Sequence, residues 1–299
     1  KAMYADKLSM EEFTELSKQP DSERALLFLK SIKDEFKTLS ETADRIEIET
    51  QLDKNLIKDI QKIEKLLSDN SKYYLKIFLS KYEIRCIKSV FRKIYSRSIL
   101  DEDLENVEIW TSVIFKELDG INNVANFEEF LNLIKKTPYF KVFKNYVGQD
   151  IKSINIFEIE NKLDIMYFKN MIKIAKDNRN SILKDSIGSQ IDLENILWIY
   201  RIKKFYNFSE EQIVNTLIDY FHKLSKDDIL KLIRATDYSE LKKVLEKTTY
   251  KKIVDGTENN FEQMIAKFIY DKNKKIFREN MFNINFIYAY IDIVYDENN

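Results

Sequence analysis

The chain has 299 residues, with 49 Lys or Arg against 50 Asp or Glu, so its formal net charge is only -1 although 33% of it is charged. This balance gives no global field that would attract a nucleic-acid backbone. The chain contains only 4 Gly and 2 Pro. Hairpins, tight turns and phosphate-binding loops depend on these residues for their backbone angles. The composition therefore argues against a β-rich fold or a dinucleotide-binding enzyme and predicts an all-α protein.

The sequence also bears on the cellular compartment. A single cysteine, Cys86, leaves no partner for an intrachain disulfide. The chain has no signal-like start and no unbroken apolar run of the roughly 18 residues that a membrane-spanning helix needs. We therefore expect a cytoplasmic chain without a membrane span.

A helix-start pattern occurs three times, beginning at Ser9, Asn126 and Ser225. Each copy has a capping residue, acidic residues in the next turn and a leucine seven residues on. The capping side chain accepts a hydrogen bond from the first free backbone amides, and the acid lies against the positive helix end. We call this pattern the first landmark and expect a helix to begin at each copy.

Two further patterns recur in the same order. The second landmark, Glu-Ile-Glu followed by Leu-Asp, begins at Glu47 and Glu158 and has a weaker form at Glu258. The third landmark is an acid or amide followed by apolar residues at helical spacing, and it begins at Glu83, Asp192 and Asn283. Counted for the second landmark at Leu52, Leu163 and Phe261, the landmarks are offset by 117, 111 and 109 residues between the first two copies, and by 99, 98 and 91 between the last two.

A period near a hundred residues is longer than that of solenoid repeats, so each copy is expected to be a small helical domain. We predict repeat units at residues 1–98, 99–208 and 209–299. Such units either string out or close into a ring about a pseudo-threefold axis. In the closed arrangement, the polar faces of the third-landmark helices could line a central concavity.

The residues that usually carry chemistry do not form a recognisable site. His222 is the only histidine, and we interpret it as a surface or boundary residue. Cys86 lies on an apolar helix and is expected to be a packed, inert thiol. Asp227 and Asp228 fall in a first helical turn, where they complement the helix dipole. No phosphate-loop, dinucleotide or nucleophile-elbow motif is present. We therefore predict no catalytic residue, no metal site and no cofactor.

Residues 200–206 interleave aromatic and basic side chains. Such a run could stack nucleic-acid bases. It is also typical of a helix with an apolar stripe and a basic face. The high Phe and Tyr content serves interfaces as well as cores, so the residues point to a binding scaffold.

The motifs resemble those of the C-type stalk protein of bacterial and archaeal V-type ATPases, the equivalent of the eukaryotic d-type protein, over essentially the whole chain. The family's K-Y-[DE]-I-x-N-[LI]-K occurs at residues 81–88, except that Cys86 replaces Asn, and Asn195 retains that Asn in the second copy. The family's P-F-x-I-G-x-x-x-A-Y is matched at residues 281–290, with Met281 and Asn285 at the Pro and Gly positions. Family members continue past the segment matching residues 296–299, so we expect the third unit to be truncated.

The resemblance implies a funnel of three helical domains that sits on the membrane rotor ring and receives the tip of the axle, which is formed by the D and F proteins. Such an adapter passes torque for proton or sodium transport and has no active site. It is peripheral on the cytoplasmic face of the membrane, without nucleic acid or a span of its own. From helical phase and the resemblance, we expect the axle-binding residues to be Glu83, Arg85, Arg92, Asp192, Glu194, Arg201 and Asn283.

Two other hypotheses remain open at this point. The chain could be a helical scaffold that binds partner peptides or helices without any connection to an ion motor. It could also be a helical hydrolase or synthase that uses clustered carboxylates with a metal or nucleotide.

Overall fold

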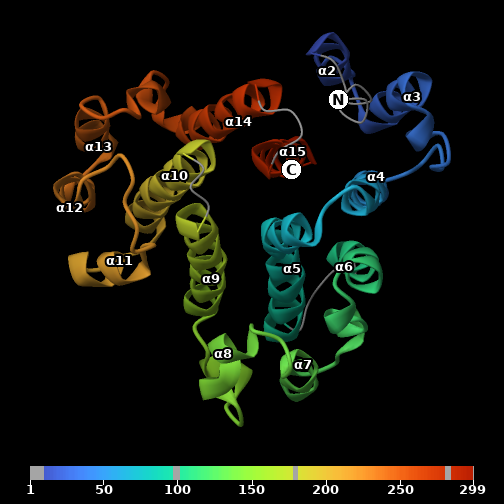
Figure 1. Cartoon of the computed structure of the whole chain (residues 1–299), viewed down its shortest axis with the longest axis horizontal. Coiled ribbons are helices and arrows are strands. Elements are labelled where there is room, and N and C mark those ends of the chain that lie inside the picture. Colours follow the sequence, from blue (N-terminus) through green and yellow to red (C-terminus); the bar gives the residue numbers. More distant parts are fainter. Residues whose placement is uncertain (1–9, 97–101, 178–180, 280–283, 299) are drawn as a thin grey trace. The chain divides into compact units, whose positions relative to one another are not determined.

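A computed structural model describes residues 10–96, 102–177, 181–279 and 284–298. Every regular element in these ranges is a helix, so the all-α prediction is confirmed. The helices are labelled along the chain in Figure 1. The low Gly and Pro content has its expected consequence, because six helices within the described ranges run for 15 residues or more.

The chain forms two compact units. Unit 1 contains the described residues up to Ser68 together with Tyr82–Ile154, and unit 2 contains Asp69–Lys81 and Asn155–Glu297. Helix α5 (Asp69–Ser96) contributes residues to both units. The division into three repeat units at residues 1–98, 99–208 and 209–299 stays a prediction.

Unit 1 is built around helix α4 (Arg45–Lys65), the second part of α5 and helix α6 (Glu102–Val113). Asp44 caps α4 through a capping box with Glu47, and α4 packs against α6. The smaller helices of the unit are α2 (Met10–Ser17), α3 (Ser22–Ile32), η1 (Asp34–Phe36), η2 (Lys116–Leu118), η3 (Ile121–Asn123), α7 (Phe127–Ile134), α8 (Phe140–Phe143), η4 (Lys144–Tyr146) and η5 (Ile151–Ser153).

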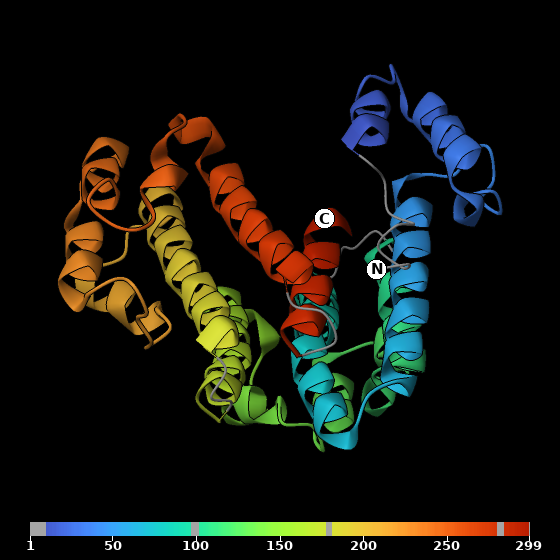
Figure 2. The ribbon, with the colours of Figure 1, turned by 45° about the horizontal axis from the view of Figure 1, so that its top comes forward.

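Unit 2 is built around four long helices, α9 (Ile156–Asp177), α10 (Ser181–Phe205), α14 (Phe261–Glu279) and α15 (Ile284–Asn298). Both α9 and α14 pack against α10, as Figures 1 and 2 show. The smaller helices are α11 (Glu210–Thr216), α12 (Lys226–Arg234), α13 (Tyr238–Leu245), η6 (Lys251–Val254) and η7 (Glu258–Asn260). One buried cluster joins α10 to α11–α14, with Ile196, Leu232, Leu245 and Phe261 at 0% exposure.

The described landmarks lie at the N-termini of helices or inside them. Asn126 caps α7 and Ser225 caps α12, the latter in a capping box with Asp228, while Ser9 lies outside the described residues. The second landmark occupies the first turns of α4 and α9, and Glu258 opens η7. The third landmark lies within α5 and α10, and its last copy leads into α15.

The element order also recurs. A pair of long helices, α4 and α5, is followed by the short helices α6, α7 and α8. The pair α9 and α10 is followed in the same way by α11, α12 and α13, and α14 and α15 form a further long pair. This recurrence agrees with the order of the landmarks and supports the repeat hypothesis.

Three equivalent positions of the third landmark, Ile87, Ile196 and Ile287, are buried as expected, with exposed fractions of 0%, 0% and 8%. We predict that changing any one of them to Ala lowers the free energy of unfolding by about 2 to 5 kcal/mol, because a cavity replaces packed methyl groups. Urea unfolding measures the change, and Val214→Ala at a position 46% exposed is the control. A loss no larger than that of the control would contradict the assignment of Ile87, Ile196 and Ile287 to equivalent buried positions.

Candidate functional site

Glu83, the first acid expected at the axle surface, lies in the interior of unit 1. It is 6% exposed, and its Oε2 accepts a 2.6 Å hydrogen bond from the hydroxyl of Tyr139, which follows α7. Burial, and then the nearby Glu83 carboxylate, raises the pKa of Tyr139, so the phenol stays protonated and donates. This pair fastens the α7–α8 segment to α5.

Asp192 has the same position on α10 and is fully buried. Its carboxylate accepts hydrogen bonds from the backbone N–H groups of His222, Lys223 and Leu224, at 2.9, 2.7 and 3.2 Å. It also accepts a 2.8 Å bond from the hydroxyl of Tyr250, whose pKa is raised by burial and by Asp192 itself. Four donors thus replace the water that a buried carboxylate loses.

Glu83 and Asp192 have the same kind of hydrogen-bond partner. Each accepts a hydrogen bond from a buried tyrosine that lies 56 or 58 residues further along the chain. Both are buried, and both carboxylates are already hydrogen-bonded inside their own unit. We assign Glu83 and Asp192 to the internal structure and do not carry them into the proposed interface.

Arg85 also makes its contacts within unit 1. Its Nη2 lies 2.9 Å from Oδ2 of Asp53 on α4, and its guanidinium stacks over the Tyr82 ring at 5.3 Å. Burial raises the pKa of Asp53, and the charge of Arg85 opposes that rise. The pair joins α4 to α5 and leaves Arg85 about one third exposed.

The other expected residues lie nearer the surface. Arg92 on α5 is exposed, Glu194 on α10 is half-buried and Arg201 on α10 is exposed. Glu194 and Arg201 are seven residues apart, so they share one face of α10. Asn283 lies outside the described residues. The described surface candidates are therefore Arg92 in unit 1 and Glu194 with Arg201 in unit 2.

Sequence reasoning missed the acids that face α10. Arg201 binds Glu262 of α14 in a bidentate pair, with Nε–Oε1 and Nη2–Oε2 distances of 3.1 and 2.6 Å. This hydrogen bonding lowers the pKa of Glu262. Nearby, Lys204 lies 3.7 Å from Glu258. The signal was present, because Arg201 and Lys204 are three apart while Glu258 and Glu262 are four apart, and helical neighbours at these spacings share a face.

The interpretations of the remaining reactive residues are confirmed. His222 is partly buried, and its Nε2 lies 2.9 Å from Asp185. Cys86 is 2% exposed, and burial raises the pKa of its thiol to about 12. Asp228 accepts hydrogen bonds from the backbone N–H and the hydroxyl of Ser225, at 2.9 and 2.6 Å, as part of the α12 capping box.

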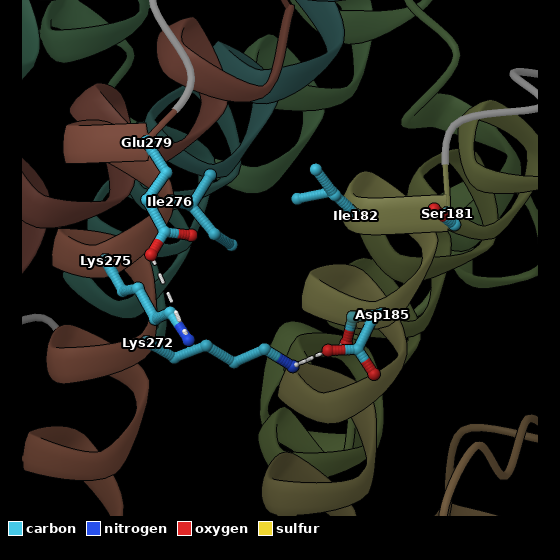
Figure 3. A pocket seen from close by; sticks show the side chains of 7 residues that line it. All are labelled: Ser181, Ile182, Asp185, Lys272, Lys275, Ile276 and Glu279. Carbon is cyan, nitrogen blue, oxygen red and sulfur yellow. Dashed lines mark hydrogen bonds and ion pairs between the residues drawn. The ribbon is translucent and has the colours of Figure 1, made fainter.

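A cavity of about 410 Å³ lies between α10 and α14 (Figure 3). Its lining residues are Ser181, Ile182, Asp185, Lys272, Lys275, Ile276 and Glu279. Asp185 lies 2.7 Å from both Lys272 and Lys223, and although burial opposes it, this pairing lowers the pKa of the carboxyl. The charges are thus satisfied within the chain. The described residues bring together no group of His, Cys, Asp and Glu that could hold a metal ion.

These features define an all-helical protein whose buried carboxylates organise its own fold. No helix in the described ranges combines the length and apolar character needed to cross a membrane. A sequence model of the ATP synthase (C/AC39) subunit family matches residues 1–293. The chain therefore belongs to the ATP synthase (C/AC39) subunit family.

Curated relatives named as the C component of A-type ATP synthase are similar at low identity. The Methanosphaera stadtmanae protein is 23% identical over 95% of this chain and 76% of its own length. The Thermococcus kodakarensis protein is 25% identical over 89% of this chain and 74% of its own length. The Methanococcoides burtonii protein is 25% identical over 75% of this chain, and the match spans only 62% of that relative, less than two thirds of its length.

We predict that Cys86 in the folded chain resists alkylation by iodoacetamide at pH 8, because the thiol is buried and almost wholly protonated. The reaction should be on the order of a thousandfold slower than in the urea-unfolded chain, since an ordinary thiol has a pKa of about 8.5 and is partly ionised at this pH. Mass spectrometry of timed samples measures both rates. Similar rates in the two states would contradict the packed environment of Cys86.

Proposed function

We propose that the chain is a non-catalytic central-stalk subunit of a rotary V-type ATPase. In this role it links the axle, formed by the D and F proteins, to the membrane rotor ring and transmits torque for ion transport. The family match over residues 1–293 carries the proposal, and the names of the relatives agree with it. The proposed place of the chain is peripheral, on the cytoplasmic face of the membrane.

The packing of the long helices supports such a role. A torque adapter needs a stiff body, and close-packed aromatic rings resist deformation better than a loosely packed core. In unit 1, Phe91 of α5 lies 6.1 Å from Phe130 and 5.3 Å from Phe143 between ring centroids. In unit 2, Tyr200 of α10 lies 5.0 Å from Phe261. Helices α5 and α10 are thus anchored to neighbouring segments by large side chains.

The proposed architecture is a funnel of three helical domains about a pseudo-threefold axis, with units at residues 1–98, 99–208 and 209–299. The recurring order of long and short helices supports it. The axle would contact the polar faces of α5 and α10, where Arg92, Glu194 and Arg201 lie at or near the surface. Exposed charges of this kind mainly set association rate and salt dependence, at about 0.2 to 1 kcal/mol per pair.

We predict that reversing Arg92 and Arg201 together to Glu weakens binding of the D–F axle, and does so more at low salt than at high salt, because salt screens exposed charges. Calorimetry or interferometry at two ionic strengths measures the affinity. Lys162→Glu, which reverses an exposed charge on α9, is the control. An unchanged affinity at both salt levels would remove the two arginines from the interface.

We further predict that the chain is catalytically silent but required for coupling. Reconstitution with and without it, following ATP hydrolysis and ion transport in parallel, is the test. Without the chain, the soluble head should keep most of its ATP hydrolysis while ion pumping is lost, and adding the purified chain back should restore pumping. Pumping that persists at full rate without the chain would refute the proposal.

A further inference from the structure

Helix α15 carries polar side chains on a face that is buried in unit 2. Asn285, Tyr288 and Asp292 are 2%, 2% and 3% exposed. Their spacings of three and four residues place them in one stripe along the helix. A buried helix face is normally apolar, because a polar group taken out of water costs free energy unless it is hydrogen-bonded. The stripe therefore needs a partner surface with matching polar groups.

That partner surface is present for Asp292. Its Oδ1 lies 2.8 Å from Nζ of Lys81 on α5, and the two side chains are only 4% and 13% exposed. Its Oδ2 accepts a hydrogen bond from the amide of Asn273 on α14, which in turn accepts a 3.1 Å bond from the hydroxyl of Ser186 on α10. One carboxylate thus connects α15 to α5 directly and to α10 through α14.

Tyr288 makes a second polar link. Its hydroxyl donates a 2.6 Å hydrogen bond to Oε1 of Gln190 on α10, while its ring packs against Phe78 of α5 at 5.2 Å. Gln190 stands six residues before Ile196, and Lys81 stands six residues before Ile87. The residues two positions before the third landmark in α5 and α10 therefore both contact α15.

Asp292 departs from the pattern of the other two copies. It stands five residues after Ile287, where α5 and α10 carry Arg92 and Arg201 five residues after their own isoleucines. Both arginines are exposed, whereas Asp292 is buried. The acid in α15 thus stands where α5 and α10 carry an exposed arginine, and it pairs with Lys81 in the interior of unit 2.

The polar stripe permits only one position of α15 along and around its own axis. Sliding or rotating the helix by one residue would move Asp292 from Lys81 and Tyr288 from Gln190 together, which leaves buried groups unpaired. Breaking a buried ion pair by removing one partner is strongly destabilising, whereas replacing both partners by neutral groups is often nearly neutral. Lys81 and Asp292 are 211 residues apart in sequence, so this ion pair is a long-range contact.

We propose that α15 is a strap latched onto unit 2 by the Lys81–Asp292 ion pair, and that it opens as one piece while α10–α13 stay folded. The pair fixes the register of α15 and sets the population of the open form. This inference concerns the fold of unit 2 alone and is independent of the partners proposed above.

Hydrogen exchange of the full chain, resolved by peptide mass spectrometry, tests the latch. Lys81→Met and Asp292→Asn should each lose about a hundredfold of exchange protection across residues 284–293, with little change in α10–α13. The double variant should recover most of that protection, because it buries no unpaired charge. Lys162→Met, which removes an exposed ion pair on α9, should change nothing in α15.

Three outcomes would overturn the latch: equal loss of protection throughout unit 2, no loss in either single variant, or a double variant no better than the worse single one. The unaltered chain gives a test that does not depend on the variants folding. In increasing urea, below the unfolding transition, the amides of residues 284–293 should exchange together at a lower opening free energy than the buried amides of α10. A common opening free energy for α10 and α15 would contradict the strap.

Discussion

The buried carboxylate of Asp192 organises the part of unit 2 that surrounds α10. An ionised carboxylate is expensive to bury, so its place at 0% exposure depends on the four donors that surround it. Three of these donors are consecutive backbone amides at residues 222–224, directly before α12, and the fourth is Tyr250 after α13. The apolar cluster between α10 and α11–α14 is therefore positioned by one polar anchor. Glu83 and Tyr139 provide a simpler anchor of the same kind in unit 1.

The sequence predicted the helices well because their causes are local. Scarcity of Gly and Pro, capping residues and apolar spacing act over a few residues, and they correctly indicated an all-α fold, the α12 capping box and the burial of Ile87, Ile196 and Ile287. The burial of Cys86 also followed from its apolar helix. Each of these predictions needed only the residues within one or two helical turns.

The candidate interface was harder to predict because it depends on contacts that are distant in sequence. Helical phase placed Glu83 and Asp192 on polar positions, which suggested a surface, but the tyrosines that cover them lie more than fifty residues away. The partners of Arg85 and Arg201, Asp53 and Glu262, are likewise on other helices. The spacing of charges along one helix reveals which residues share a face, but not which other helix covers that face.

The third landmark consequently serves different purposes in different copies. Its opening acids in α5 and α10 fasten neighbouring segments, and its later arginines are exposed, with Arg201 also paired to Glu262 of α14. In α15 the corresponding later position, Asp292, is used for an internal ion pair. A repeated helical plan can in this way supply a stiff body together with a charged surface, which are the two properties that the proposed adapter needs.

The proposed function requires that the chain works as part of a rotary ATPase. The most direct measurement is isolation of the tagged full-length protein from its native membranes in mild detergent, followed by identification and quantification of the proteins that accompany it. If the chain is a rotor component, axle, head and rotor-ring proteins should accompany the tagged protein in constant ratios. Recovery of the tagged protein with none of these, from membranes that contain an intact ATPase, would contradict the proposed function.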